Sequence, residues 1–516
     1  MTNKNFNKST ATIKKFLCAS ICTTLALSTV GCNTTTISEN NVTKPSFGEI
    51  TTSATETTQE TSTGTTTAET TIEETTIFNE VFDDAPAIPE RPEYTERKEL
   101  SVSVSLESLM NIGKENVENS LLPRLDINME LDVPDITKLN YTDAIITISN
   151  SGDEASNVES AVGKIKLRGN STLDAKKKSI KIKFNEKQTL FNGSNSKSWA
   201  LLANPYDMTS GVHNYVAYNL YRYITPDDKF VPNVTFVDLY INDRYQGIYT
   251  ICDQIDAAKD KINIDNKLAE TPEETDYLIE QDMRAYYGDD YYKENITWFW
   301  MNADNVAFTI NNIDEADLEG SIDETGVSPY TVYVKSYMDN VYTTICSKDW
   351  DKIQETIDVE SIIEGFLINE VIKNQDIDKA SVYYTIPKDG KLTYATIWDC
   401  DLAFGGGEIG EPDSGLNAEK NIIFGNLMQV PEFREMYITY FNEHIDDIYN
   451  KANELIDDIS TKYNAELSNE YLNWSIHYRN NSLEEMRNFA TFDEQISYMK
   501  DWLNRRVEFL KTQYTN

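Results

Sequence analysis

The sequence predicts an α+β fold in two lobes, with a β-rich N-terminal lobe and a mostly helical C-terminal lobe. Three observations predict it. Apolar and polar residues alternate in short runs between residues 121 and 282, as they do in half-buried strands. Apolar residues recur at helical intervals in most of the chain from residue 350 onward. Between these regions, residues 374–407 form a hairpin pattern flanked by acidic residues, so a cleft is expected at this junction.

Alternation defines the strands of the N-terminal lobe, which we expect over about residues 99–282. In the run 179–184, Ile180, Ile182 and Phe184 share one face, whereas Lys181 and Lys183 share the other. A helix is expected over 211–224. The other expected strands have the same alternation and lie at 121–130, 143–151, 164–167 and 275–282, with two more in 234–255 joined by a turn at 242–244.

A glycine-containing turn, Arg168-Gly169-Asn170-Ser171-Thr172, joins two of these strands. Lysines stand on the open face of the strand that follows it. This arrangement could bind phosphate groups, because the turn offers backbone amides and the following strand offers lysines. Lysines are also common on the solvent face of any sheet, so the pattern by itself leaves both interpretations open.

Helices are expected throughout most of the C-terminal lobe, over about residues 340–516. The spacing of apolar residues predicts one long helix over 350–374 and further helices over 430–459 and 484–512. The segment 285–340 is rich in Tyr, Asp and Asn and has few pattern signals, so no element is predicted there.

Two acidic clusters flank the predicted hairpin. Its strands are VYYTI and KLTYATIW, and Pro387-Lys388-Asp389-Gly390 between them is typical of a tight turn. Folding this hairpin brings Asp376 and Asp378 beside Asp399 and Asp401. Carboxylates gathered in this way repel one another unless a hard cation lies between them. Magnesium together with phosphate is therefore the expected occupant.

The N-terminus has the features of an export signal. Residues 1–31 carry four lysines followed by an apolar run, and they end at Gly31-Cys32, which is typical of a lipoprotein signal peptide. Residues 32–92 are predicted to form a disordered stalk, because Thr51 to Thr76 contain fourteen Thr, five Glu and no aromatic residue. The folded domain is expected over 93–516. We expect an exported protein, lipid-anchored through Cys32 on the outer face of the cell membrane, or otherwise secreted.

The net charge restricts the possible partners. It is −39 for the whole chain, and it becomes −43 without the first 31 residues, which carry four lysines and no acid. Such a charge disfavours nucleic acid and anionic membrane surfaces as partners. Contact with a membrane is therefore expected only through the lipid anchor.

Several quoted stretches together resemble the spore coat protein H (CotH) family of atypical secreted protein kinases. They are RGNST followed by KKSIKIKF, SWALLANPYD, and NQDIDKAS with IWDCDLAFGG, and the resemblance spans roughly residues 121–441. It implies a kinase-like fold, ATP and Mg²⁺, and transfer of phosphate to Ser or Thr of secreted or surface proteins. Protein kinases also place a catalytic Asp, a metal ligand five residues later, a hairpin and a second metal-binding Asp in this order.

The resemblance also implies roles for the acidic residues. Asp376 corresponds to the catalytic base that accepts the proton of the acceptor hydroxyl. Asp399 would hold magnesium, with Asp401 beside it, and Ser381 would be a further ligand. Ser381 stands where many members of the family have Asn.

Binding of the nucleotide is assigned by the same resemblance to the N-terminal lobe. Lys183 matches the lysine that contacts the α- and β-phosphates. The loop over the nucleotide is formed by Arg168, Gly169, Asn170 and Ser171.

A calcium-binding loop is one alternative interpretation of the first acidic cluster. Asn374, Asp376 and Asp378 imitate positions 1, 3 and 5 of an EF-hand loop. Lys379 takes the place of the required Gly, and Thr385 takes the place of the required Glu. The loop therefore lacks two essential features.

Two other functions stay open from the residues. Asp399 and Asp401 could be a glycosidase acid pair, although no aromatic platform for a sugar can be identified. The chain could also be a non-catalytic, kinase-like surface protein that acts as an adhesin or assembly factor. The presence of Lys183, Asp376 and Asp399 together favours the enzyme.

Overall fold

The computed structural model describes residues 93–94, 101–111, 113–303, 306–406, 412–475 and 489–515. The expected signal peptide, Cys32 and the expected stalk lie outside these residues, so those predictions stay predictions. Within the described ranges, the helices are too short or too polar to cross a lipid bilayer.

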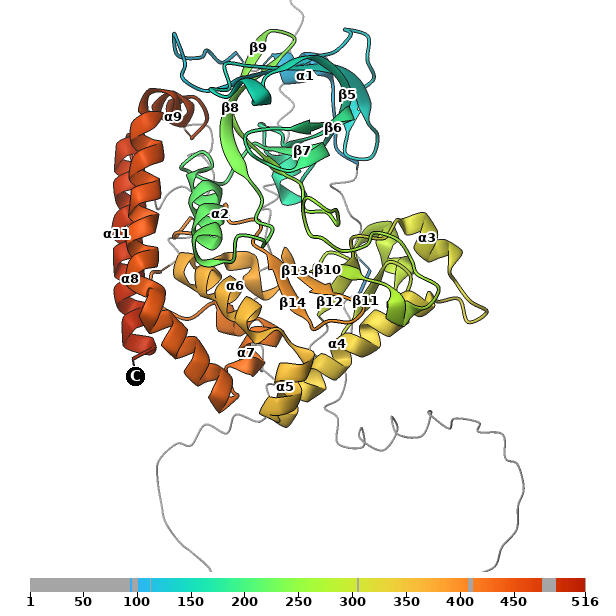
Figure 1. Ribbon diagram of the computed structural model, residues 1–516. Helices are drawn as coiled ribbons and strands as arrows, with labels where there is room; N and C mark the ends of the chain where they lie inside the picture. Colours follow the sequence, from blue (N-terminus) through green and yellow to red (C-terminus); the bar gives the residue numbers. More distant parts are fainter. Residues whose placement is uncertain are drawn as a thin grey trace, which may run out of the picture. The chain divides into compact units, whose positions relative to one another are not determined.

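Seven strands close into a barrel in the N-terminal half (Figure 1). Neighbouring strands are antiparallel, except that β2 and β8 pair in parallel and thereby close the barrel. In order around the barrel, the strands are β2 (Arg124–Asn128), β4 (Thr142–Ser149), β5 (Val158–Leu167), β6 (Ile180–Thr189), β7 (Asn195–Leu202), β9 (Arg244–Asp253) and β8 (Val234–Ile241).

Apolar side chains fill the barrel as the alternation predicts. Ile180, Ile182 and Phe184 of β6 are buried in one cluster with Ile165 and Trp199 from neighbouring strands. The small elements β1 (Ser103–Val104), α1 (Leu106–Met110) and β3 (Ile136–Thr137) contribute apolar residues to the same cluster. The lysines of β5 and β6 are therefore left on the outer face of the barrel.

A second, five-stranded sheet contains the predicted hairpin. All its neighbouring strands are antiparallel. Two of its strands lie in the segment for which the sequence patterns predicted no element. The order across the sheet is β11 (Trp298–Trp300), β12 (Ala307–Ile310), β10 (Tyr277–Gln281), β13 (Val382–Ile386) and β14 (Thr393–Thr396).

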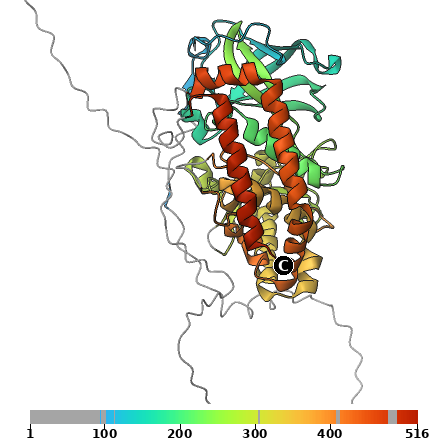
Figure 2. The ribbon, with the colours of Figure 1, turned by 90° about the vertical axis from the view of Figure 1, so that its left-hand side faces the viewer.

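Helices make up most of the regular structure outside the strands in the described part. Figure 2 shows α8 and α11, two long helices that pack side by side. The predicted helix over 211–224 is found as α2 (Val212–Ile224), and the mixed α and β composition agrees with the prediction. The others are α3 (Glu315–Gly320), α4 (Pro329–Ser347), α5 (Trp350–Thr356), α6 (Val359–Ile372), α7 (Ile422–Leu427), α8 (Pro431–Lys462), α9 (Asn464–Glu470) and α11 (Phe492–Gln513).

The prediction of one uninterrupted helix over 350–374 is wrong. Ile357 has extended backbone and forms a β-bridge with Leu392, so α5 ends before it. The Asp358 side chain then accepts a hydrogen bond of 3.2 Å from the Ser361 amide and begins α6. A local N-cap therefore overrides the continuous apolar stripe.

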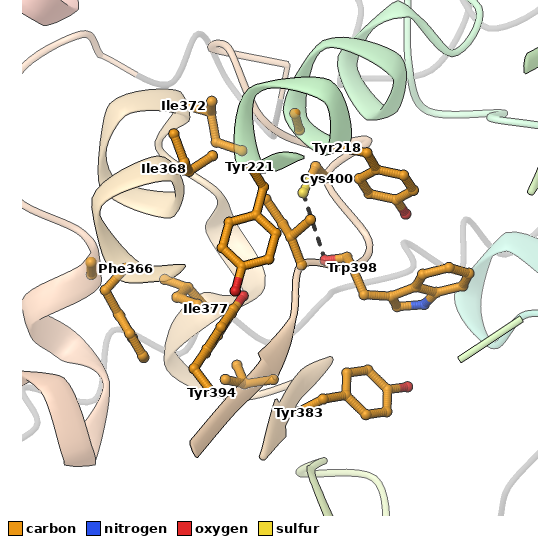
Figure 3. Packing of buried hydrophobic residues seen from close by; sticks show 14 of the residues in the cluster. Tyr218, Tyr221, Phe366, Ile368, Ile372, Ile377, Tyr383, Tyr394, Trp398 and Cys400 are labelled. Carbon is orange, nitrogen blue, oxygen red and sulfur yellow. Dashed lines mark hydrogen bonds between the residues drawn. The ribbon is translucent and has the colours of Figure 1, made fainter. Parts of the chain in front are cut away.

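The hairpin is packed between α2 and α6 (Figure 3). The Tyr221 ring of α2 meets the Tyr394 ring of β14 edge to face, with centroids 5.8 Å apart. The Phe366 ring of α6 meets Tyr394 at 5.6 Å. All three residues are buried. Aromatic rings favour particular relative orientations and stabilise a fold beyond the apolar area that they bury. These contacts therefore hold the hairpin in one position relative to both helices.

A buried ion pair joins the barrel to α9. The Lys177 Nζ atom lies 2.5 Å from a carboxylate oxygen of Glu470, and both side chains are almost fully buried. The second oxygen of Glu470 accepts a hydrogen bond of 2.8 Å from the Ile248 amide in β9. The end of α9 is therefore fixed to the barrel wall.

A second buried ion pair, Arg506 with Glu370, joins α11 to α6. The Arg506 guanidinium also donates to the main-chain oxygen of Glu370 at 2.9 Å. The Glu370 carboxylate accepts hydrogen bonds from the amides of Asn417 and Ala418. This pair therefore fixes the turn that precedes α7.

Candidate functional site

The acidic loop before the hairpin begins where α6 ends. Lys373 has left-handed backbone, with φ of 52°, and turns the chain out of the helix. Asn374 follows, and its side chain accepts a hydrogen bond of 3.2 Å from the Asp376 amide. Its amide group donates to the Asn369 side chain at 3.0 Å. Asp376 is therefore placed in a single short turn, Gln375–Asp378.

Side chains from two other elements hold the backbone of this turn. Gln281, at the end of β10, donates to the Asp378 carbonyl at 2.8 Å. Asn421, at the start of α7, donates to the Ile377 carbonyl at 2.8 Å and to the Gln281 side chain at 3.0 Å. The turn is therefore fixed from both sides, which pre-organises Asp376.

Ser381 and Asp399, which the sequence predicted as metal ligands, lie together. The Ser381 hydroxyl donates to the Asp399 carboxylate at 3.3 Å. Both residues have a φ of 58°. Left-handed backbone is unfavourable for residues other than glycine, and it tends to occur at functional sites. The hairpin thus brings together the residue before β13 and the segment after β14.

The segment 399–401 is held by α2. Asn214 accepts a hydrogen bond of 2.8 Å from the Cys400 amide. The Tyr218 hydroxyl accepts one of 3.3 Å from the Asp399 amide. A ring nitrogen of His213 lies 2.9 Å from the Asp401 carbonyl oxygen. Three residues of one helix therefore set the positions of both predicted metal-binding aspartates.

The carboxylates at the junction influence one another. Burial raises the pKa of Asp376 to about 6, and the negative charge of Asp399 adds to the increase. Burial also raises the pKa of Asp401 well above its ordinary value, with further contributions from Asp399, Asp376 and Asp207. Like charges in a buried place disfavour ionisation, and a bound cation would favour it.

The oxygen ligands near Asp399 suit a metal ion that the protein coordinates only in part. Within the described ranges, no three His, Cys, Asp or Glu side chains are gathered closely enough to hold a metal. The adjacent oxygens of Asp399 and Ser381 offer an incomplete set of hard ligands. Mg²⁺ commonly binds through one or two carboxylates, with phosphate and water completing its shell. The residues present therefore fit magnesium that arrives with a phosphate.

The predicted glycine loop of the barrel reaches the acidic hairpin. The Arg168 guanidinium lies 5.6 Å from the centre of the Trp398 ring, next to Asp399. Gly169 has a φ of +104°, and a Cβ atom there would lie 2.1 Å from the Thr172 hydroxyl oxygen. Only glycine fits this position without a shift. The tight turn therefore directs Arg168 towards the hairpin.

The two other predicted loop residues are engaged within the barrel region. The Asn170 side-chain oxygen accepts a hydrogen bond of 2.7 Å from Lys138. The Ser171 carbonyl accepts one of 3.1 Å from the Tyr206 hydroxyl. These contacts fix the shape of the loop.

Lys183 is exposed on the outer face of β6, opposite Lys164 and Ser198. Lys181 lies on the same face, opposite Lys166, and is more buried. Burial lowers the pKa of Lys181 to about 8, and the charges of Lys166 and Arg168 lower it further.

Lys181 is therefore a phosphate-binding candidate that the sequence interpretation missed. Alternation places Lys181 on the same face as Lys183, but this pattern does not show which of the two is more buried and closer to Arg168.

The cationic and acidic groups lie close enough to act on one buried thiol. Cys252 in β9 is fully buried, and burial raises its pKa to about 12. The positive charge of Arg168 opposes this increase, and the negative charge of Asp399 adds to it. Arg168 from the barrel and Asp399 beside the hairpin therefore both act on the same buried residue.

Asp207 also belongs to this site and was not predicted. Its carboxylate accepts hydrogen bonds from the amides of Thr209 and Gly211, at 2.7 and 3.0 Å. It lies 3.3 Å from a ring nitrogen of His213. Asp207 thus fixes the turn before α2 and the position of His213, which contacts Asp401.

The fold and site define an α+β protein in which Arg168 of the barrel's glycine turn lies beside a hairpin flanked by carboxylates. The CotH kinase protein family model matches residues 165–510 of the 516-residue chain. The chain therefore belongs to this family, which confirms the resemblance in its sequence. A search of curated proteins finds no match.

Proposed function

We propose that this chain is a protein kinase that transfers the γ-phosphate of ATP to Ser or Thr of exported or cell-surface proteins. The observation that carries the proposal is the position of Arg168, whose guanidinium lies 5.6 Å from the Trp398 ring, next to Asp399, and whose charge also acts on Lys181. Phosphates require cations, and a phosphate-bound magnesium ion requires carboxylates. In this proposal the barrel is the N-terminal lobe, and the sheet with its helices is the C-terminal lobe.

Asp376 is the proposed base. Its carboxylate accepts the proton of the acceptor hydroxyl while the hydroxyl oxygen forms a bond to the γ-phosphorus. The bond from that phosphorus to the bridging oxygen breaks, and ADP leaves with the electron pair. Little covalent chemistry is asked of the protein, so positioning and charge account for most of the catalysis.

Magnesium would be held by Asp399 with Ser381, and Asp401 would be the neighbouring carboxylate. When bound, the ion neutralises charge on the phosphates. Arg168 and Lys181 would contact phosphate oxygens from the barrel side. Lys183 would contribute a longer-range positive charge from the rim of the same strand.

The location and partners are part of the proposal. The signal pattern of residues 1–31 and Cys32 favour export and a lipid anchor, with the Thr-rich stalk between the anchor and the domain. The acceptor is therefore proposed to be an exported or surface protein. The net charge of −39 argues against nucleic acid.

Calorimetric titration of the full chain with ATP, with and without magnesium, tests the proposal. We expect magnesium-dependent binding that Asp399→Ala abolishes, because the substitution removes the carboxylate next to Ser381. Asp389→Ala is the matched control, since Asp389 is an exposed acid in the turn of the same hairpin. Absence of binding by the parent protein would contradict the proposal and favour a non-catalytic surface protein.

The two lysines of β6 should differ in their effect on nucleotide binding. Lys181→Met is expected to weaken binding of ATP with magnesium by roughly tenfold or more, the usual effect of losing a charge-assisted hydrogen bond. Lys183→Met should weaken it only about twofold, because an exposed charge is screened. The same titration at fixed salt measures both. A larger loss of affinity in Lys183→Met than in Lys181→Met would show that Lys183 is the phosphate-binding lysine.

A further inference from the structure

A groove lies on the helical part of the chain, and its lining includes none of the residues of the proposed active site. Its volume is about 670 Å³, and residues of α5, α6 and the first half of α8 line it. Its apolar lining comes from Trp350, Ile363, Met436 and Tyr440. Ile363 is buried and the other three are half-buried. The volume is sufficient for a few side chains of a bound segment.

Five glutamates surround this apolar lining: Glu360, Glu364, Glu432, Glu435 and Glu443. Residues three and four apart on a helix share a face. Glu432, Glu435 and Glu443 therefore line one stripe of α8, and Glu360 and Glu364 occupy successive turns of α6. Two helices thus present carboxylates to the same hollow.

These carboxylates are not neutralised by cations in the groove. No lysine, arginine or histidine is among the groove's described lining residues. Burial raises the pKa of Glu364 to about 7; Lys229 opposes the increase, and the charges of Asp358 and Glu360 add to it. The groove is therefore both apolar and negatively charged.

We propose that this groove docks a segment of a partner protein in which lysines or arginines flank apolar side chains. The apolar side chains would cover Trp350, Met436 and Tyr440, and the cations would meet the glutamates. A second copy of this chain is a poor occupant, because two copies each carry a net charge of −39. The inference does not depend on kinase activity, since binding can be measured without nucleotide.

Fluorescence anisotropy with a short, labelled peptide of alternating lysine and leucine tests the groove in the full chain. We expect binding that weakens by at least about tenfold in the triple variant Glu360→Gln, Glu364→Gln, Glu435→Gln. Met436→Ala should also weaken it. The matched control removes three exposed acids from the barrel: Asp143→Asn, Glu159→Gln and Glu186→Gln. This control should bind as the parent does.

Four outcomes would overturn the proposal. The first is no binding by the parent. The second is an equal loss in the barrel control, which would show attraction by net charge alone. The third is equal binding of a peptide of lysines without leucine, since the apolar lining would then have no role. The fourth is concentration-dependent self-association, measured by sedimentation and lost in the groove variant, which would make the groove an interface between copies.

Discussion

Asp376→Asn is expected to lower the rate of phosphoryl transfer by about 10²- to 10⁴-fold, the usual contribution of a positioned base. The amide has nearly the same shape but cannot accept the proton. The hydrogen bond from the Asp376 amide to Asn374 involves only main chain at residue 376, so the turn should persist. Calorimetry should show nearly unchanged binding of ATP with magnesium, while turnover with an acceptor protein is lost.

Asp378→Asn is the control for this change. Asp378 lies in the same turn, and one of its buried oxygens makes no hydrogen bond within the described part of the chain. Its substitution should change the rate only slightly. A similar loss in both variants would mean that the turn as a whole matters, rather than the base.

The pH dependence provides an independent check on the base. The folded-state pKa of Asp376 is raised to about 6, so the carboxylate becomes protonated as the pH falls through that value. The rate should therefore fall below about pH 6, and bound magnesium would shift this limb to lower pH. A rate that stays constant down to pH 4 would contradict the assignment.

Arg506→Met is expected to lower the free energy of unfolding by about 3–5 kcal/mol. The substitution leaves the Glu370 carboxylate buried without its cation. It also removes hydrogen bonds from Arg506 to the carbonyls of Asp413 and Gly415, at 2.9 and 2.7 Å. Urea unfolding of the parent and the variant measures this loss of free energy, provided that the two have the same m-value.

Arg505→Met is the matched control on the same helix. The Arg505 side chain is 44% exposed and pairs with Asp413 and Asp501 near the surface. Exposed ion pairs contribute little, so a loss below about 1 kcal/mol is expected. Equal losses in both variants would show that the Glu370 pair is no more important than a surface pair.

The secondary-structure elements that depend on local sequence patterns could be predicted from the sequence. The helix over 211–224 and the hairpin around Pro387 follow from spacing and turn chemistry, and both are found. The hairpin also predicted that Asp376 lies near Asp399, and the charge of Asp399 does act on Asp376. The break at Ile357 was also encoded locally, by the cap Asp358, but the continuous apolar stripe concealed it.

Features that depend on distant contacts were not predictable. The barrel closes through parallel pairing of β2 with β8, and no periodicity specifies which strand lies beside which. The contact of His213 with Asp401 spans 188 residues. Lys181 and Lys183 are equivalent by alternation, and only the position of Arg168 relative to the strand distinguishes them.

The buried pair of Lys177 with Glu470 has a consequence for how the chain folds during synthesis. Lys177 lies in the connection between β5 and β6 of the barrel, whereas its partner lies 293 residues later. Until α9 has emerged from the ribosome, burying the Lys177 ammonium in the barrel would leave it without that carboxylate, which is unfavourable. N-terminal segments generally fold first during translation. Here the native barrel should be completed late, so a nascent chain that stops before Glu470 should be digested readily by protease.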